Sequence, residues 1–346
     1  MNRIAKNGFL LTISIPTYNR AQFVVPLVES LLQQLEPEVL LRVIDNASAA
    51  DIADAIRRMV PAEQAPQVEI IRNTHNVGGA ANLMRAFELC QTEWLWILGD
   101  DDTVDGHAIR SALAAIAANA ESVAITFSSP RYVQKRCCNT HGAAHYLEQV
   151  SSFSAAVFNP TVLYRASSML PAIRFGYHCL CSMAPHLAML LLTLGSDAVA
   201  SFSDRSLIAV HRDPPATDRW SPIVHLVGRG TLLDLPLDHS TRRRLNAMMA
   251  SRPRLEALAL LQWLLVLRGC DREYARHLFD QAYYRVYACC PGAFKRTRVV
   301  LYRALFRCPR IGVEIARVVL AGTRRVSPWK LKRIEDLKAP DLFSRV

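Results

Sequence analysis

The sequence predicts an α/β protein with a mostly parallel sheet flanked by helices, followed by a helical, basic C-terminal region. Through about the first 120 residues, short apolar runs alternate with segments of helical periodicity, and polar turns separate them. Such alternation is typical of a parallel sheet whose connections are helices. The charge is also uneven, because residues 251–346 hold 20 Lys and Arg against 8 Asp and Glu, whereas the first 250 residues hold 21 against 22.

The expected elements follow one another at short intervals. We predict strands over residues 10–15, 39–44, 68–71 and 94–98, and helices over 22–35, 51–59 and 80–90. The pattern then weakens: we expect a strand at 123–127, a loop over 130–150, a helix at 185–194 and a further strand within 198–211. From about residue 223 onward the periodicity is helical.

The composition excludes several classes of protein. Hydrophobic residues make up 51% of the 346 residues and charged residues 21%, which excludes a disordered chain. The nine cysteines form no CxxC pair, so they favour free thiols in a reducing cytosol over a disulfide framework or a zinc site. No apolar stretch approaches the roughly 18 residues needed to cross a bilayer, and no signal peptide is evident. We therefore expect a cytoplasmic protein without membrane-spanning helices.

Polar side chains follow the predicted strands where each strand ends. Because ligands of open α/β sheets bind at the carboxyl ends of the strands, we expect Asp45, Asn76 and the run Asp100-Asp101-Asp102 to share one crevice. Three adjacent carboxylates repel one another, and a bound divalent cation removes that cost. Mg²⁺ and Mn²⁺ prefer such oxygens and commonly keep substrate phosphate as a ligand. The alternative is a solvated acidic turn that caps the next helix.

Two other features of the crevice have open interpretations. Asp45 ends the second strand, where doubly wound folds place an acid against a ribose or base. It could equally form an Asx turn or cap the following helix. The loop from Asn76 to Gly79 resembles a glycine-rich approach to a helix N-terminus, but it has the spacing of neither a dinucleotide fingerprint nor a P-loop.

Four motifs in order resemble those of family 2 glycosyltransferases with the GT-A fold, a Rossmann-like sheet. The motifs are Ser14-Ile15-Pro16-Thr17-Tyr18-Asn19-Arg20, Val43-Ile44-Asp45-Asn46-Ala47-Ser48, Asn76-Val77-Gly78-Gly79-Ala80-Ala81-Asn82 and Trp96-Ile97-Leu98-Gly99-Asp100-Asp101-Asp102. Each motif is weak alone, but the ordered set, over roughly residues 9–120, is specific. The resemblance implies a nucleotide-binding half at 9–120 and an acceptor half at 121–222, which together form a catalytic domain over 1–222, and a basic region at 223–346.

The resemblance also implies roles for individual residues. It assigns the donor nucleotide and sugar to Pro16, Thr17, Tyr18, Asp45, Asn76, Gly79, Asn82 and Asp100, with Asp45 at the base and Asp100 near the ribose. The aspartates correspond to the metal-binding DxD element, although its usual first Asp aligns with Gly99. We therefore expect Asp101 to be the main ligand of Mn²⁺ or Mg²⁺ and Asp102 to be a second ligand or an orienting group.

The residue that activates the acceptor is less clearly indicated. Family members often carry a Glu-Asp pair on the helix after the sheet, where this chain has Ala184-Pro185-His186. His186 could be the general base, since a neutral imidazole suits that work near pH 7, or it could be a packed residue at a helix start. Asp197 is the second candidate base. His211 lies near where the family often places a histidine that faces the metal or the diphosphate.

The C-terminal arginines recur at helical spacing. Pro309 interrupts their run, so we expect two helices. The arginines at this spacing are Arg296, Arg303, Arg307, Arg310, Arg317 and Arg324. One cationic face suits an anionic membrane surface, which would place the enzyme on the cytosolic face of the inner membrane. The alternative is a solvated face packed on the catalytic domain. No nucleic-acid-binding motif is present, so we expect no nucleic acid partner.

The function that the resemblance implies is transfer of a sugar from a nucleotide-sugar donor, with UDP or dTDP, to a glycan or lipid-linked acceptor. Inversion, metal dependence and a place in surface polysaccharide synthesis are expected with it. Two alternatives stay open. A sugar-phosphate nucleotidyltransferase would normally need a glycine-rich, Arg- or Lys-bearing loop after the first strand, where this chain has Pro16 to Arg20. A catalytically silent nucleotide-sugar or glycan binder of the same fold would explain the missing carboxylate base.

Overall fold

A computed structural model describes residues 8–134, 136–211 and 228–250, together with a few single positions beyond them. The chain divides into two compact units. The first comprises Met1–Leu180, Ala184–Arg219 and Leu235–Arg242, and it contains every strand that the structure describes. The second comprises Cys181–Met183, Trp220–Asp234 and Arg243–Val346.

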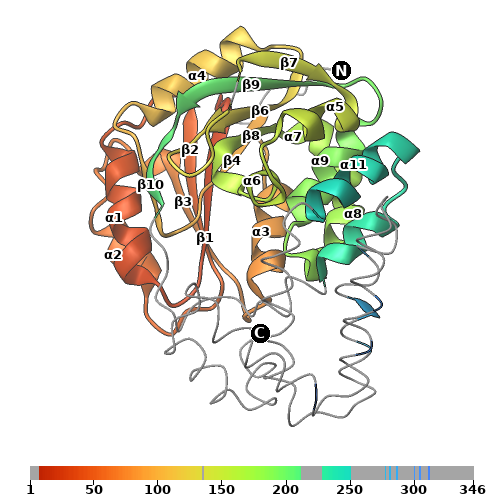
Figure 1. The fold of residues 1–346 in the computed structure, drawn as a ribbon. Helices are drawn as coiled ribbons and strands as arrows, with labels where there is room; N and C mark the ends of the chain where they lie inside the picture. The colour runs from red at the N-terminus through yellow and green to blue at the C-terminus, as the bar shows by residue number, and fades with distance from the viewer. Residues whose placement is uncertain are drawn as a thin grey trace. The chain divides into compact units, whose positions relative to one another are not determined.

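The first unit is built on an eight-stranded sheet (Figure 1). Its strand order is β3-β2-β1-β4-β8-β6-β9-β7, and β5 and β10 form a separate two-stranded sheet. The strands are β1 (Leu11–Thr17), β2 (Val39–Asp45), β3 (Val68–Arg72), β4 (Trp94–Ile97), β5 (Asp102–Val104), β6 (Ser122–Ser128), β7 (Cys138–His141), β8 (Val162–Arg165), β9 (Val199–Ser206) and β10 (Ile208–His211). The first four strands are parallel, while β8 runs antiparallel to both of its neighbours.

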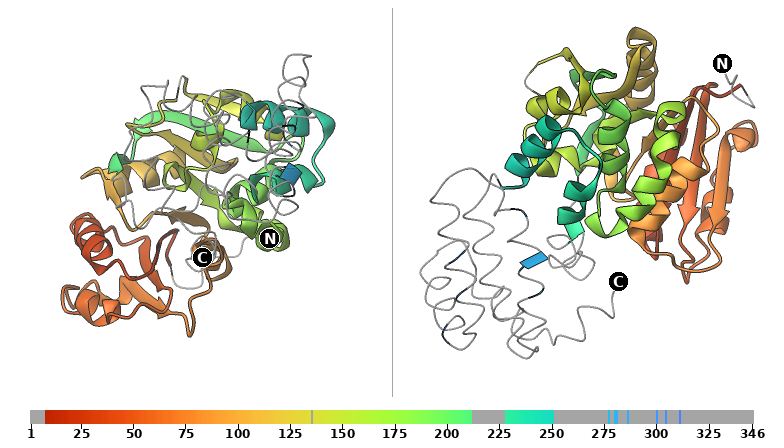
Figure 2. Two further views of the ribbon diagram at one scale, coloured as in Figure 1. Left: turned by 60° about the horizontal axis from the view of Figure 1, so that its bottom comes forward. Right: turned by 90° about the vertical axis from the view of Figure 1, so that its right-hand side faces the viewer.

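Helices pack on both faces of this sheet. The longer helices of the first unit are α1 (Ala21–Leu32), α2 (Ile52–Arg57), α3 (Gly79–Glu88), α4 (Ala108–Ala118), α5 (Gly142–Gln149), α8 (Ile173–His178) and α9 (Pro185–Leu194), and two single turns are α6 (Phe153–Ala156) and α7 (Ala166–Met169). Helix α11 (His239–Met249) is divided between the two units. Helices α1, α2 and α4 lie on one side, and α3 packs with α8 and α9 on the other (Figures 1 and 2).

The apolar runs of the sequence form the core because both faces of the central strands are covered. Every residue of β2 and β4 is buried, as expected for parallel strands between two helical layers. Leu11, Ile13 and Ile15 of β1 pack against α1, whose buried residues recur at helical spacing. The indole N–H of Trp96 is also satisfied, since it donates to the carbonyl of Pro160 at 2.8 Å.

The predicted alternation of strands and helices is confirmed, and two local expectations are wrong. Residues 130–150 are not simply a loop, because they contain β7 and α5. Strand β8 was not anticipated; it is only four residues long and sits between β4 and β6. Both β7 and β8 are short antiparallel strands stabilised by distant partners, so the local pattern is a poor guide to them.

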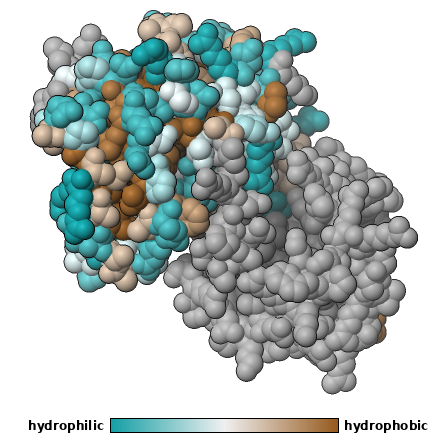
Figure 3. All heavy atoms as spheres, turned by 90° about the vertical axis from the view of Figure 1, so that its left-hand side faces the viewer, coloured by the Kyte–Doolittle hydropathy of each residue, from teal (hydrophilic) through white to brown (hydrophobic). Residues whose placement is uncertain are grey.

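The surface of the unit that carries the sheet is mixed in character. Hydrophilic residues cover much of the face that includes α1 and α2, with apolar residues visible in the hollows between them (Figure 3). In the part of the chain that the structure describes, no helix combines the length and the apolarity needed to cross a membrane. The arginines from Arg296 to Arg324, on which the predicted membrane face depends, lie outside the described residues.

Gly142, which begins α5, should be hard to replace. Its φ is +76°, and a Cβ there would sit 2.3 Å from the backbone oxygen of Ser196. We predict that Gly142→Ala lowers the free energy of unfolding by about 2 kcal/mol or more, through left-handed strain and this clash. Urea unfolding of the whole protein measures the change. Gly106→Ala is the control, because nothing lies within 4 Å of its Cβ position. Equal stability of the two variants would contradict the packing described.

Candidate active site

The carboxyl ends of the first three strands are aligned in one row. Thr17 of β1 pairs in register with Asp45 of β2, which pairs with Arg72 of β3. On the other side of β1, Ser14 pairs with Ile97, the last residue of β4. The three aspartates that follow β4 therefore lie at the same edge of the sheet as the turn after β1. The pairing register of the strands thus brings these loops to one edge of the sheet.

The acidic turn, Asp100-Asp101-Asp102, is linked to the turn after β1 by a hydroxyl and a guanidinium. The hydroxyl of Thr17 donates to Asp100 Oδ2 at 2.8 Å. Arg20 reaches two carboxylates: Nη1 is 2.5 Å from Asp100 Oδ1, and Nη2 is 3.0 Å from Asp101 Oδ2. Arg20 was not among the residues expected to form the site. It precedes α1, and its guanidinium lies 4.8 Å above the ring of Phe23.

Asp102 is directed back at its own turn. Its Oδ2 accepts from the backbone N–H of Gly99 at 2.7 Å, and its N–H donates to the carbonyl of Gly99 at 3.1 Å. A Cβ on Gly99 would lie 2.9 Å from Asp102 Oδ2 and 3.0 Å from Asp101 Oδ1. Gly99 therefore has no room for a side chain, and one oxygen from each of the two carboxylates lies close to the same point beside it.

Asp100 is a weaker acid than an ordinary aspartate. Burial raises the pKa of Asp100 to about 6, against the opposing effects of the Arg20 charge and the Thr17 hydrogen bond. The neighbouring charges of Asp101 and Asp102 raise it further. The ionised form of this carboxyl is therefore costly in the fold, and a nearby positive charge is needed to stabilise it.

The donor set of the acidic turn suits a hard divalent cation. Carboxylate oxygens are the ligands that Mg²⁺ and Mn²⁺ prefer, and Mg²⁺ commonly uses one or two of them together with phosphate and water. Asp101 Oδ1 and Asp102 Oδ2 lie close to the same point beside Gly99, so these two residues fit that pattern. Among the described residues, no group of three or more His, Cys, Asp or Glu side chains could hold a metal ion.

Asp45, which the family resemblance assigns to the base, is buried at the end of β2. Its side chain is 1% exposed. One carboxylate oxygen, Oδ1, accepts from the backbone N–H and the hydroxyl of Ser48, and Oδ2 accepts from Arg72 at 3.0 Å. Arg72 also donates to the carbonyl of Ser48 at 2.6 Å and is 48% exposed. In this structure Asp45 holds the loop and Arg72 faces the solvent, so the Asx-turn interpretation describes its contacts.

Four asparagine side chains connect the loops after β2 and β3. Asn46 is the centre: its Oδ1 accepts from Asn73 Nδ2 and from the backbone N–H of Val77, and its Nδ2 donates to Asn76 Oδ1 at 2.6 Å. Asn73 also donates to Asn82 Oδ1, and Asn82 in turn donates to the carbonyl of Ile44. Asn76 and Asn82 therefore hold the loops through this network, and sequence reasoning missed Asn46 and Asn73.

The turns after β1 and β2 are tied to each other in strained conformations. Asn19 has a φ of 54° and Ala47 a φ of 64°, which is left-handed backbone that costs about 1 kcal/mol or more for an alanine. The side-chain oxygen of Asn19 accepts from the backbone N–H of Ala49, and the backbone N–H of Asn19 donates to Ser48 Oγ. This link leaves the ring of Tyr18 42% exposed beside the turn. Pro16 is half-buried at the end of β1, and Gly79 begins α3.

His186 is closed off from solvent. It lies in the first turn of α9, is 1% exposed, and packs edge-on against Tyr164 with ring centroids 6.5 Å apart. Burial lowers the pKa of His186 to about 4. The backbone of Val157 offsets part of that shift, although neither ring nitrogen makes a hydrogen bond of good geometry. The packed-histidine interpretation fits this environment, and an acceptor could not reach the imidazole in this conformation.

The other two predicted residues lie in different places. Asp197 is exposed in the turn before β9, and it accepts from the hydroxyl of Ser196. Because β9 is parallel to β6 and starts level with Ser122, Asp197 lies at the amino edge of the sheet, opposite the acidic turn. The structure therefore does not bring Asp197 to the site. His211 ends β10 and pairs in register with Asp102, while its side chain lies outside what is described.

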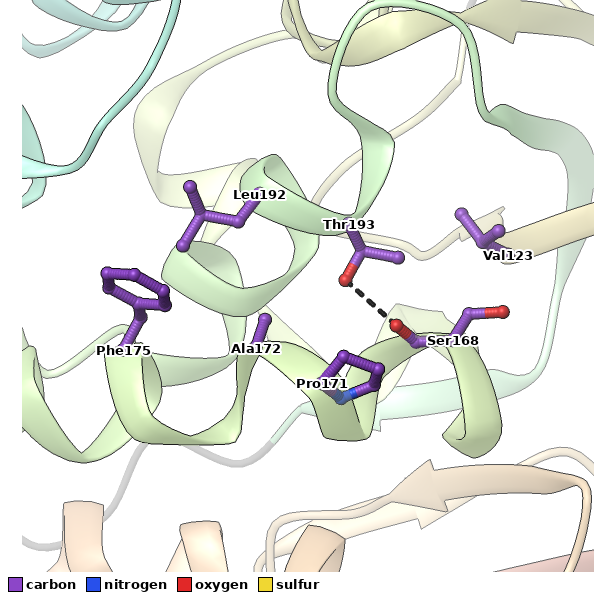
Figure 4. A pocket seen from close by; sticks show the side chains of 7 residues that line it. All are labelled: Val123, Ser168, Pro171, Ala172, Phe175, Leu192 and Thr193. Carbon is purple, nitrogen blue, oxygen red and sulfur yellow. Dashed lines mark hydrogen bonds between the residues drawn. The ribbon is translucent and has the colours of Figure 1, made fainter.

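A surface pocket lies between α7, α8 and α9 (Figure 4). Its lining is largely apolar: Val123, Ser168, Pro171, Ala172, Phe175, Leu192 and Thr193. The hydroxyl of Thr193 donates to the carbonyl of Ser168 within it. Val123 stands near the start of β6, so this pocket also lies toward the amino edge. It contains no charged side chain, and it is separate from the acidic turn.

The acidic turn lies within a part of the chain that matches a known protein family. Residues 12–144 match the profile of Glycosyl transferase family 2. That stretch contains the turn after β1, Asp45, the asparagine network and Asp100 to Asp102. It ends before β8, β9 and α9.

Two curated relatives match the same part of the chain. The glycosyl transferase WcaA of Escherichia coli (strain K12), whose name assigns it to colanic acid biosynthesis, is 30% identical over 97 residues, which are 28% of this chain and 34% of that protein. An uncharacterized glycosyltransferase of Haemophilus influenzae is 30% identical over 110 residues, 32% of this chain and 35% of that protein. The chain thus matches about a third of the length of each relative.

A solved structure resembles the chain over most of its length. The crystal structure of S. aureus TarS 1–349 in complex with UDP-GlcNAc superposes with a TM-score of 0.62, covering 90% of this chain and 92% of that one. Their sequences are 14% identical, so the likeness shows a shared fold.

The buried imidazole of His186 should make stability depend on pH. Its folded pKa of about 4 lies below the ordinary value of 6.5, so the unfolded chain binds the extra proton first as pH falls. The stabilisation from the neutral form is complete above pH 6.5 and should be lost between about pH 6.5 and 4, with a total near 3 kcal/mol. Urea unfolding at a series of pH values measures this loss.

His186→Phe keeps a ring against Tyr164 and removes the titrating group, so its loss of stability over that pH range should be smaller than that of the unmodified protein. His178→Asn, a change at an exposed histidine, serves as the control and should follow the unmodified protein. Identical pH profiles for all three proteins would show that His186 is not buried in its neutral form.

Proposed function

Because residues 12–144 form a family 2 glycosyltransferase domain on a GT-A-type fold, we propose that this protein transfers a sugar from a nucleotide-sugar donor to a glycan or lipid-linked acceptor. The donor nucleotide that we propose is UDP or dTDP. The observation that carries the proposal is the acidic turn, which sits at the carboxyl edge of the matched parallel strands with one oxygen each of Asp101 and Asp102 close to the same point beside Gly99.

The donor would lie along the aligned strand ends. The turn of Pro16, Thr17 and Tyr18 would border the nucleotide, and the exposed ring of Tyr18 offers it an apolar surface. The positive charge in this crevice comes from Arg20 and Arg72, which suits a diphosphate. Asp45 would act on the base side mainly by holding Arg72 and Ser48 in position. The asparagine network would keep the loops of Asn76 and Gly79 at their present separation.

Mn²⁺ or Mg²⁺ would be held by Asp101 and Asp102, with the His211 imidazole as a further candidate ligand from the neighbouring strand. When bound, the cation would neutralise the diphosphate that leaves with the nucleoside. Asp100 would help from the side, since Thr17 and Arg20 fix its carboxylate. We propose that the sugar is transferred with inversion, as the family resemblance implies.

The proposal has weaker support in the acceptor half, residues 121–222, than in the nucleotide-binding half. His186 is buried against Tyr164, so its surroundings would have to rearrange before it could take a proton from an acceptor. Asp197 is at the other edge and is not proposed as the base. The name of the matched relative WcaA supports a role in bacterial surface polysaccharide synthesis. The charge of residues 251–346 supports attachment to the cytosolic face of an anionic membrane.

The two alternative functions have less support. A nucleotidyltransferase is disfavoured because the family match covers the very turns that would have to differ, and Pro16 to Arg20 is not a glycine-rich loop. A silent binder would bind the donor without turning it over. Incubation of a nucleotide sugar with Mn²⁺ separates a silent binder from a transferase, because a transferase releases nucleoside diphosphate slowly even without its acceptor.

A nucleotide screen tests the proposed donor class. We predict that UDP or dTDP with Mn²⁺ raises the thermal unfolding temperature of the full chain, and that the matching nucleotide sugar is slowly hydrolysed. Asp101→Asn should lower that hydrolysis by about a hundredfold or more, since a neutral amide is a poor cation ligand and loses the negative charge. Its unfolding temperature without ligand should not fall, because one of three crowded charges has been removed.

Glu63→Gln is the matched control. Glu63 is an exposed carboxylate between α2 and β3, and its loss should leave hydrolysis unchanged. Binding without any hydrolysis in the unmodified protein would favour the silent binder. Full hydrolysis by Asp101→Asn would refute the role of the acidic turn.

A further inference from the structure

Arg20 bridges two of the three aspartates of the acidic turn. Its two terminal nitrogens contact two different aspartates, Asp100 at 2.5 Å and Asp101 at 3.0 Å. The guanidinium belongs to the turn after β1, 80 residues away in the sequence. Its side chain remains 21% exposed, so this ion pair is accessible to solvent and is not sealed inside the core.

We propose that Arg20 is the internal counter-ion of the acidic turn, and that it makes the binding of a divalent cation depend on the diphosphate of the donor. The inference rests on the proposed function, because it takes the diphosphate of a nucleotide as the second ligand. It adds an order of events: the cation binds weakly alone and tightly together with the nucleotide.

The first step of the argument is competition for Asp101. Its Oδ2 is occupied by Arg20, and its Oδ1 lies beside Gly99, near the same point as Asp102 Oδ2. A cation held by these carboxylates would share Asp101 with a guanidinium, which keeps its proton and its charge at any ordinary pH. Two positive species at one carboxylate repel each other, and the low exposure of the Asp101 side chain, 12%, strengthens this repulsion. Arg20 therefore lowers the affinity of the turn for a cation on its own.

The second step is that a diphosphate reverses this effect. The guanidinium fork matches phosphate oxygens as well as it matches carboxylates, so Arg20 can exchange one anionic partner for another at little cost. Its Nε is buried and makes no hydrogen bond, so the exchange would involve the two terminal nitrogens that now contact the aspartates. Phe23 supports the guanidinium from one side, which favours a small swing of the fork over withdrawal of the whole side chain. The incoming phosphate charge also cancels the repulsion between Arg20 and the cation.

A purely structural role for Arg20 gives a different expectation. If Arg20 only connected the two turns, its removal would loosen the acidic turn and weaken cation binding, both alone and with nucleotide. The proposed role requires the opposite sign for the cation alone. The direction of the change therefore separates the two roles, without reference to catalytic activity.

The test is direct measurement of free Mn²⁺ by electron paramagnetic resonance during titration of the full-length protein. Arg20→Met keeps the length of the stem and removes the charge. We expect it to bind Mn²⁺ alone about tenfold tighter or more than the unmodified protein does. UDP should tighten Mn²⁺ binding strongly in the unmodified protein and much less in Arg20→Met, whereas uridine, which has no diphosphate, should have no effect in either. Arg20→Lys should lie between the two.

Arg58→Met is the control, because Arg58 forms an exposed ion pair with Asp54 within α2 and its flank. It should behave as the unmodified protein does. Weaker or unchanged Mn²⁺ binding by Arg20→Met in the absence of nucleotide would overturn the proposal. Tight Mn²⁺ binding by the unmodified protein without nucleotide would overturn it as well. If neither UDP nor dTDP binds any of the proteins, the proposed function fails, while the comparison with Mn²⁺ alone still decides whether Arg20 is the counter-ion.

Discussion

The structure of this site depends on three adjacent carboxylates at the end of β4, two of which are buried. Each carboxylate is stabilised by a different neighbour. Asp100 accepts from the Thr17 hydroxyl and from Arg20, Asp101 accepts from Arg20, and Asp102 accepts from the backbone of Gly99. Without these contacts the ionised turn could not be buried, because an uncompensated charge costs several kcal/mol. The turn after β1 and the turn after β4 are thereby fixed to each other, and this sets the shape of the crevice.

A similar pairing of a buried acid with an arginine and a hydroxyl occurs at the end of β2. Asp45 at the end of β2 is buried more deeply than any of the three, and it too is matched by an arginine from a neighbouring turn, Arg72, and by a hydroxyl, that of Ser48. Four acids, Asp45 and Asp100 to Asp102, lie at this edge of the sheet with two arginines, so the edge keeps an excess of negative charge that a bound cation would offset. In the Asp100–Arg20 and Asp45–Arg72 pairs the carboxylate is buried and the arginine is partly exposed. The cationic groups are therefore the more accessible members of these pairs, which suits an anionic nucleotide.

Much of the fold is readable from the sequence, because the first strands are apolar runs between helical layers. The runs at β2 and β4 have no polar interruption on the face that packs against α1, so their pattern is decisive. The pattern fails for β8, which is four residues long and is stabilised by pairing with β4 and β6, strands that are distant in the sequence. It fails also for α5, whose start depends on Gly142 fitting against Ser196.

The residues of the candidate site can be predicted from the sequence only in part. A run of three aspartates after an apolar strand is visible in any sequence, whereas its partner Arg20 is identified only once β1 and β4 are known to be neighbours. Asn46 and Asn73 look like ordinary turn residues until their amides are seen to join. His186 shows the opposite error: the residue type suggests chemistry, and burial against Tyr164 shows packing.

The donor-binding residues that the sequence predicts lie in one continuous part of the chain. The proposed donor side lies in turns inside one continuous stretch, residues 12–144, so local motifs and the family match describe the same residues. The proposed acceptor half includes β8, β9 and α9, which lie beyond that stretch, and β8 and β9 join the sheet through long-range pairing. Compensation of negative charge at the strand ends is a demand that short polar turns can meet, and such turns are visible in the sequence. Residues that come together only through long-range pairing of the sheet form no local motif, so the sequence alone does not identify them.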